Sequence, residues 1–214
     1  MKNPPKAPKR LAVLVSGSGS NLQALIDRTE DGTLPVDIVR VISNVPGVYA
    51  LERAEKHGIP VKVIPHGQYA NAGEFSQAIL EELLRCQADI VCLAGFMRIL
   101  TAEVPLAFPG RMLNIHPALL PAFGGKGMYG HHVHQAVLDS GTQFSGATVH
   151  IVTEEPDAGP IVLQKIVPVL PDDDVESLAK RVLEVEHEIY PQAVKWVAED
   201  RLIIKGKRVA VKED

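Results

Sequence analysis

The sequence has few cysteines, no dominant charge and no long apolar run. Two cysteines in 214 residues exclude a disulfide-bonded scaffold, and we expect Cys86 and Cys92 to be reduced thiols packed in the interior. No apolar run approaches the roughly 20 residues that a membrane-spanning helix needs, and Leu11 to Val15 is too short for a signal sequence. These absences predict a cytoplasmic protein.

Neither sign of charge is in large excess, because 22 basic residues stand against 26 acidic ones, for a formal net charge of -4. The chain therefore has no general attraction for nucleic acid or for an acidic membrane surface, and any anion must be bound locally. What the sequence does have is 46% apolar residues. At this length they allow roughly 70% of the extended-chain surface to be buried.

Short apolar runs alternate with helical patterns from residue 10 onward. The runs are too uniformly apolar to have one face in water, which is typical of parallel strands covered on both sides. The expected strands are 11–15, 37–43, 60–64, 89–95 and 112–116, and the expected crossover helices are 22–28, 48–57 and 75–85. This order predicts an α/β fold, doubly wound, with a mostly parallel sheet and helices on both faces.

The pattern changes after residue 117. We expect a Gly-rich loop over 122–130, a helix near 133–138, strands at 146–153 and 161–169, a long helix from Val175 and a terminal hairpin of 202–204 with 208–211. Pro191 should kink or restart the long helix. No linker interrupts the chain, so we expect one domain over residues 10–214 behind a flexible tail over residues 1–9.

The segment Ser16-Gly-Ser-Gly-Ser-Asn21 follows a strand and opens a helix. Its glycines allow close backbone approach, and the helix N-terminus offers free N–H groups and a positive dipole end, which suits a phosphate. A dinucleotide motif would need glycine at Leu22, and a Walker A motif would need Gly-Lys-Ser/Thr at residues 21–23. The alternative is a glycine turn that only joins strand to helix.

Asn114 and His116 share one face of a strand, because side chains alternate, and Ile115 points into the core. Pro117 ends the strand. An amide and an imidazole side by side at a strand end are paired donors for one developing negative charge, as an acyl-transfer intermediate requires. The alternative is a histidine with a purely structural role.

The acidic turn Thr153-Glu-Glu-Pro-Asp-Ala-Gly-Pro160 lies between two strands. Pro156 and Gly159 flank Asp157, which makes its carboxylate the one that the turn would hold rigidly. Near His116, that carboxylate would raise the pKa of the imidazole above its reference of about 6.5 and pass protons through it. The alternative is a turn whose carboxylates are all solvated.

The segment Leu93-Ala-Gly-Phe-Met-Arg-Ile-Leu100 could wall a slot for a flat heterocycle, although such residues also form ordinary core. Five histidines lie between residues 116 and 150, but their spacing fits no zinc motif. We expect no metal; His131 to His134 should enter a helix, and His150 should lie on the strand that leads to Asp157.

Together, the motifs resemble the 10-formyltetrahydrofolate-dependent formyltransferases. The resemblance covers about residues 10–204 and rests on the sequences of residues 16–24, 93–100, 113–121, 157–160 and 186–191. It implies a Rossmann-related fold in which the formyl group of 10-formyltetrahydrofolate, a co-substrate, passes to the primary amine of glycinamide ribonucleotide in purine synthesis.

The resemblance also implies a role for individual residues. The implied catalytic residues are Asn114, His116 and Asp157. The implied ribonucleotide site is Gly17, Ser18, Gly19, Ser20, Asn21 and Glu186, the last of which periodicity alone would make a solvated helix charge. The implied folate site is Met97, Arg98, Ile99, Leu100, Asn114, Val152, Thr153, Glu154, Glu155 and Asp157. The Gly-rich loop is expected to be a mobile flap near them.

Three other functions stay open on the sequence. Methionyl-tRNA formyltransferases share the motif around Asn114 but carry a further RNA-binding domain, of which residues 202–214 could only be a remnant. Formyltetrahydrofolate hydrolases need a regulatory domain before the first strand. A non-catalytic phosphometabolite-binding protein would use the Gly-Ser segment alone, and would give no reason for Asn114, His116 and Asp157 to be present together.

Overall fold

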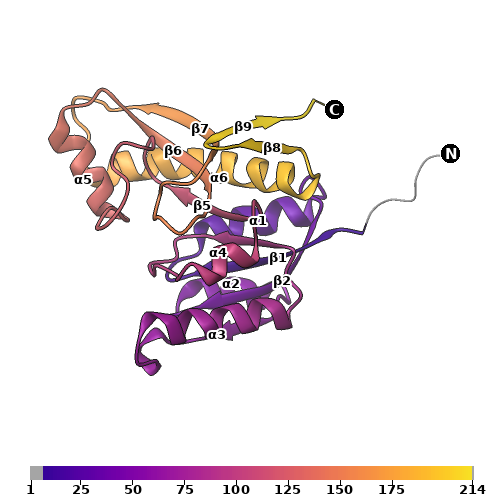
Figure 1. The fold of residues 1–214 in the computed structure, drawn as a ribbon. Coiled ribbons are helices and arrows are strands. Elements are labelled where there is room, and N and C mark those ends of the chain that lie inside the picture. The colour runs from indigo at the N-terminus through magenta and orange to yellow at the C-terminus, as the bar shows by residue number, and fades with distance from the viewer. Residues whose placement is uncertain (1–6, 214) are drawn as a thin grey trace.

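A seven-stranded sheet forms the centre of the computed structural model, which describes residues 7–213 (Figure 1). The strands are β1 Lys9–Val15, β2 Val36–Ser43, β3 Val61–Val63, β4 Ile90–Leu93, β5 Met112–His116, β6 Phe144–Ile151 and β7 Ile161–Pro168. Their spatial order is β3-β2-β1-β4-β5-β6-β7. The first five strands are mutually parallel, and β6 and β7 continue the sheet antiparallel. The predicted fold class is confirmed.

Helices cover both faces of the sheet (Figure 1). They are α1 Ser20–Glu30, α2 Tyr49–Lys56, α3 Ala72–Arg85, α4 Glu103–Ala107, α5 His131–Ser140 and α6 Val175–Ala198, with a 3-10 turn η1 at His66–Gln68. One core packs α1, α2, α5 and α6 against the sheet, and the other packs α3 and α4 against the opposite face.

Strand β1 shows why a uniformly apolar run indicates a strand that is covered on both faces. Its alternate residues Leu11, Val13 and Val15 belong to one core, whereas Ala12 and Leu14 belong to the other. All five are fully buried. In a strand that is covered on both faces, odd-numbered and even-numbered side chains are both buried. The sequence therefore shows a continuous apolar run, not an alternation of apolar and polar residues.

Helix α6 is the longest element and continues through Pro191. The expected restart is therefore wrong, because Tyr190, Ala193 and Val194 on both sides of the proline are buried against the sheet. The helix begins with a capping box between Asp174 and Ser177. Within its apolar face, the Tyr190 hydroxyl lies 2.9 Å from the carbonyl oxygen of Leu93 in β4 and 3.2 Å from that of Leu113 in β5.

The remaining elements match the expectations in part. The terminal hairpin is present as β8 Leu202–Lys205 and β9 Arg208–Val211, but α4 and η1 were not predicted. Both cysteines are free and buried as expected, and burial raises the pKa of the Cys92 thiol to about 12. Most of the expected tail, residues 1–6, lies outside the described residues, and its predicted end is wrong, because Lys9 already belongs to β1. None of the helices described between residues 7 and 213 is both long and apolar enough to cross a membrane.

Gly19 is a position where the backbone itself demands glycine. Its φ is +72°, and an added Cβ would lie 2.6 Å from the Ala50 Cβ in α2. We expect Gly19→Ala to lower the free energy of unfolding by about 2–4 kcal/mol, because left-handed strain and overpacking add. Gly58, with φ +68° and open space around it, is the control, and Gly58→Ala should cost about 1 kcal/mol. If urea unfolding showed the same loss of stability for both variants, the close approach of Gly19 to Ala50 would be contradicted.

Candidate active site

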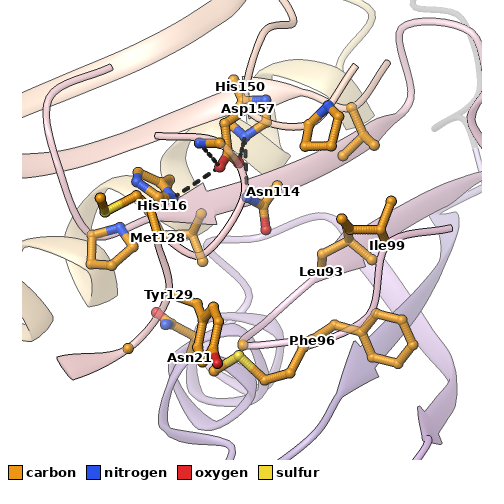
Figure 2. Close-up of a pocket in the computed structure, with 18 of the residues that line it drawn as sticks. Asn21, Leu93, Phe96, Ile99, Asn114, His116, Met128, Tyr129, His150 and Asp157 are labelled. Carbon is orange, nitrogen blue, oxygen red and sulfur yellow. Dashed lines mark hydrogen bonds and ion pairs between the residues drawn. The ribbon is translucent and has the colours of Figure 1, made fainter. Parts of the chain in front are cut away.

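A cavity of about 620 Å³ opens where β1, β4 and β5 end. Its walls come from the Gly-Ser segment after β1, the segments after β4 and β5, the Gly-rich loop, the turn between β6 and β7, and one face of α6 (Figure 2). Ligands of parallel α/β proteins bind at this edge of the sheet, because helix N-termini and irregular backbone meet there. The predicted motifs therefore converge on one cavity.

The Gly-Ser loop, residues 16–21, contributes Ser18, Ser20 and Asn21 to the cavity wall. Gly17 and Gly19 do not line the cavity; Gly19 instead packs against α2. Asn21 is buried, and its Nδ2 donates a 2.6 Å hydrogen bond to Glu186 Oε2 in α6. The Asn21 Oδ1 atom has no hydrogen-bond partner among the described residues. This pair joins the two segments that the resemblance assigned to the ribonucleotide.

Asn114 and His116 line the cavity. Ile115 is 6% exposed and packs in the core, as the strand alternation predicted, although it also borders the cavity. Figure 2 shows Asn114, His116 and His150 grouped around Asp157. His116 is 3% exposed. Its Nε2 lies 2.8 Å from the carbonyl oxygen of Phe123 in the Gly-rich loop.

Asp157 lies between two histidines. Its Oδ2 is 3.7 Å from His116 Nδ1, and its Oδ1 is 3.5 Å from His150 Nε2. The Gly125 N–H donates a 2.9 Å hydrogen bond to Oδ2. Asp157 has a positive φ of 55°, an uncommon conformation for a residue with a side chain. The turn thus directs one carboxylate toward the strand residues, as predicted.

The predicted direction of the His116 pKa is wrong. Burial lowers the pKa of His116 below 6.5, and this effect outweighs the opposing charge of Asp157 and the hydrogen bond to Phe123. Burial also pushes the pKa of Asp157 upward, but the contacts with His150, the Gly125 N–H and His116 outweigh it and leave that pKa lowered. The carboxylate is therefore ionised at neutral pH, whereas the free His116 ring is mostly neutral.

His150 is a member of the site that the sequence argument missed. It pairs with Asn114 across β5 and β6, and its Nε2 lies 3.1 Å from Asn114 Nδ2. Its Nδ1 lies 3.0 Å from the Ile151 carbonyl oxygen. His150 Nε2 therefore contacts both the Asn114 amide and, at 3.5 Å, Asp157 Oδ1, and it links these two side chains. The available signal was the strand alternation in β6, which places His150 and Thr148 on one face.

The segment after β4 forms the apolar side of the cavity. Every residue that the resemblance assigned to folate lines the cavity: Met97, Arg98, Ile99, Leu100, Asn114, Val152, Thr153, Glu154, Glu155 and Asp157. The Met97 N–H donates a 2.8 Å hydrogen bond to Ser16 Oγ in the Gly-Ser loop. This bond fixes the two walls relative to each other.

The Gly-rich loop and the start of α5 close another side. The loop contributes residues 125–130, and its backbone reaches both His116 and Asp157 through Phe123 and Gly125. His131 and His134 lie in α5 as expected. Burial, with the charges of His131 and His116, lowers the pKa of His134 to about 4. Among residues 7–213, no cluster of three or more His, Cys, Asp or Glu side chains could hold a metal ion.

The Glu186 carboxyl group in α6 is shifted toward its neutral, protonated form. Burial raises its pKa to about 7, against the opposing hydrogen bond from Asn21. Between about 4.5 and 7 the folded chain keeps a proton that the unfolded chain has released, so stability falls as pH rises through this window.

We expect Glu186→Gln to remove that pH dependence. Glutamine keeps the acceptor for Asn21 and cannot ionise, so the variant should gain on the order of 2–3 kcal/mol relative to wild type between pH 5 and pH 8. Urea unfolding at both pH values measures the difference. Glu184, exposed on the same helix, gives the control Glu184→Gln, which should follow wild type. Parallel pH profiles for wild type and Glu186→Gln would contradict the raised pKa.

The arrangement suits acyl transfer to an amine. The Asn114 amide and the His116 ring are donors beside one point, Asp157 can stabilise a positive charge on the ring, and an apolar wall excludes water from one side. The Gly-Ser loop offers N–H groups for an anion a short distance away. No comparable set of groups is needed for binding alone.

The chain is similar to known proteins over most of its length. A model of the formyl transferase family matches residues 9–194. The chain is 42% identical over 197 residues to the phosphoribosylglycinamide formyltransferase of Haemophilus influenzae, covering 92% of this chain and 91% of that protein. It is 50% identical over 207 residues to the trifunctional purine biosynthetic protein adenosine-3 of Bos taurus, covering 96% of this chain. It spans only 20% of the length of that trifunctional relative.

Solved structures are similar over nearly the whole chain. The glycinamide ribonucleotide transformylase 1 of Symbiobacterium toebii superposes with a TM-score of 0.93 at 42% identity, covering 98% of this chain and 96% of that one. A formyltetrahydrofolate deformylase from Pseudomonas syringae superposes with a TM-score of 0.87 at 28% identity, covering 96% of this chain and 66% of that one.

Proposed function

The chain belongs to the formyl transferase family, and from that premise we propose that it transfers the formyl group of 10-formyltetrahydrofolate to the primary amine of glycinamide ribonucleotide. The products are formylglycinamide ribonucleotide and tetrahydrofolate, so the reaction is a one-carbon transfer of purine synthesis. The observation that carries this proposal is that His116 contacts Asp157, and Asn114 is linked to Asp157 through His150, in a cavity that the Gly-Ser loop also lines.

The ribonucleotide occupies the edge formed by the Gly-Ser loop and Glu186. The N–H groups of the loop bind the phosphate, with Gly17 and Gly19 providing its backbone conformation. Glu186, close to its pKa at neutral pH, can donate or accept a hydrogen bond to a ribose hydroxyl. Asn21 holds the Glu186 carboxyl from the other side.

The folate occupies the apolar side. The ring system packs against the segment from Met97 to Leu100 and against Val152 to Glu155, which together form two walls of the cavity. Backbone groups of these two segments can hydrogen-bond the ring edges. The formyl group then lies next to Asn114 and Asp157.

The reaction proceeds by attack of the neutral amine on the formyl carbon. A C–N bond forms, the carbonyl oxygen becomes an oxyanion, and the Asn114 amide and the His116 ring donate hydrogen bonds to it. The oxyanion and Asp157 together favour protonation of His116, although burial disfavours it in the free protein. The bond to the folate nitrogen then breaks, and the proton that the amine loses is delivered to that nitrogen.

His116 has to exchange one hydrogen bond for this role. Its Nε2 already points to the Phe123 carbonyl oxygen, and its Nδ1 faces Asp157. Both ring nitrogens therefore face acceptors, so a ring that gains a second proton during the reaction can donate from each nitrogen. His150 supports the same centre by orienting Asn114 and contacting Asp157.

The function is tested by mixing the protein with 10-formyltetrahydrofolate and following tetrahydrofolate with and without glycinamide ribonucleotide. Formation only in the presence of the amine supports the proposal. Equal formation without it would support the second candidate, a hydrolase, which the similarity to the Pseudomonas syringae deformylase favours. No formation in either mixture would overturn both and leave a phosphometabolite-binding module.

The other alternative and the location follow from the same evidence. A methionyl-tRNA formyltransferase would bind RNA, and the net charge of -4 gives no general attraction for it. We therefore propose small-molecule substrates, with no nucleic acid partner and no metal. We place the protein in the cytoplasm, where purine synthesis would supply the ribonucleotide; the Arabidopsis thaliana relative is chloroplastic.

A further inference from the structure

We propose that Arg53, a residue of α2 that lies behind the Gly-Ser loop, is a positioning residue that holds the loop in its phosphate-binding conformation. This inference deepens the proposed function and rests on it, because it concerns how the ribonucleotide phosphate is recognised. Arg53 does not line the large cavity, so it acts on the ligand only through the loop.

Three successive carbonyl oxygens of the loop accept hydrogen bonds from α1 and α2. The Gly17 oxygen accepts a 3.1 Å hydrogen bond from the Ala50 N–H in the first turn of α2. The Ser18 oxygen accepts a 2.9 Å hydrogen bond from Arg53 Nε. The Gly19 oxygen accepts a 2.9 Å hydrogen bond from the Gln23 N–H of α1. Of these three, only the Arg53 bond comes from a side chain.

The fixed carbonyls determine where the N–H groups point. In a trans peptide the C=O and the following N–H point in opposite directions. The N–H groups of Ser18 and Gly19 therefore face away from α2, and that of Ser20 points out of the N-terminus of α1. None of the three N–H groups has a hydrogen-bond partner among residues 7–213. Ser18 and Ser20 line the cavity. Successive N–H groups that converge in this way form a concave site for an anion.

Arg53 is itself held in place on three sides. Its second donor, Nη1, lies 3.1 Å from Gln23 Oε1, and its guanidinium stacks 4.6 Å above the Tyr49 ring. The added Cβ of Gly19 would lie 3.5 Å from the Arg53 Cδ, so loop and side chain are in contact. No ion pair with a carboxylate is present for Arg53 in the described part of the chain, and its hydrogen bonds go to neutral oxygens of Ser18 and Gln23.

The test separates positioning of the loop from a simple charge effect. Arg53→Met removes the guanidinium but keeps an extended apolar stem, and Arg53→Lys keeps the charge but cannot bond Ser18 and Gln23 together. Arg28→Met is the matched control, because Arg28 lies on α1, is exposed and, among residues 7–213, has Asp31 as the one side chain it pairs with. The dissociation constant of ribose 5-phosphate is measured by calorimetry, without formyl donor, beside KM for each substrate and kcat.

We expect Arg53→Met to weaken ribose 5-phosphate binding and raise KM for the ribonucleotide about tenfold, the size of one charge-assisted hydrogen bond. KM for 10-formyltetrahydrofolate and kcat should stay within twofold of wild type, and Arg53→Lys should give about a threefold loss. Amide resonances of Ser18, Gly19 and Ser20 should shift in Arg53→Met before any ligand is added.

Two results would overturn the proposal. One is an Arg53→Met variant that binds ribose 5-phosphate like Arg28→Met. The other is an Arg53→Lys variant that binds like wild type, because charge alone would then suffice; this variant also decides the question if Arg53→Met does not fold. Phosphate binding is read without the formyl donor, so absence of formyl transfer in wild type would refute the proposed function and leave this comparison intact.

Discussion

His116→Ala is expected to lower kcat about 10³-fold, with KM for both substrates changed less than threefold. The substitution removes a donor to the oxyanion and a group that can carry the proton to the leaving nitrogen, and each such contribution is typically worth about 10²-fold or more. The ring is buried and hydrogen-bonded to the Phe123 carbonyl oxygen. Its loss also frees that carbonyl, so unfolding must be measured with the kinetics.

The matched control is His57→Ala. His57 also pairs with a carboxylate, at 2.6 Å from Glu30 Oε1, but it lies outside the cavity lining. We expect kcat of His57→Ala to stay within twofold of wild type. A His116→Ala variant whose turnover also stays within twofold, at full saturation with both substrates, would remove His116 from the mechanism.

Asp157→Asn is expected to lower kcat by 10² to 10³-fold. Asparagine keeps an acceptor for the Gly125 N–H but loses the charge that opposes the burial effect on His116. The pKa of His116 should therefore fall further below 6.5. If the protonated ring assists the reaction, the deficit should be smaller at pH 6 than at pH 8, because acid restores the proton that the carboxylate no longer holds.

The pH dependence of kcat separates this role from a structural one. Asp173→Asn is the control, because Asp173 also pairs with a cation, Arg181, at 2.7 Å, but belongs to the start of α6 and not to the cavity. It should lower stability and leave the pH profile of kcat unchanged. An Asp157→Asn deficit that is constant from pH 6 to pH 8 would mean that the carboxylate does not set the protonation of His116.

The strands could be predicted because the burial of a strand is visible in its own short stretch of sequence. Because β1 and β4 are buried on both faces, each appears in the sequence as a continuous apolar run. Strand β5 was predicted at its observed bounds, Met112–His116. Helix α4 has only five residues with a proline among them, so it carries no periodicity that a sequence pattern could detect. The course of α6 through Pro191 depends on tertiary burial, which local propensity does not contain.

The residues of the candidate site could be predicted where the geometry of a single strand or turn determines the direction of a side chain. Alternation placed Asn114 and His116 together, and a rigid turn singled out Asp157. His150 was missed because its contact with Asn114 depends on the register between β5 and β6, which no residue pattern revealed. The pKa of His116 was predicted in the wrong direction because two opposing effects compete, and only the structure shows how deeply the ring is buried.

The Tyr190 hydroxyl, bonded to carbonyls of two adjacent strands, acts as a rotational stop for α6. Glu186 lies one turn earlier on the same side of the helix, since residues four apart project in nearly the same direction. A slip of a single residue would turn α6 by roughly 100° and swing Glu186 out of the cavity. The buried Tyr190 side chain, which no ligand can touch, thus determines the rotation of α6 at which the Glu186 carboxyl faces the cavity.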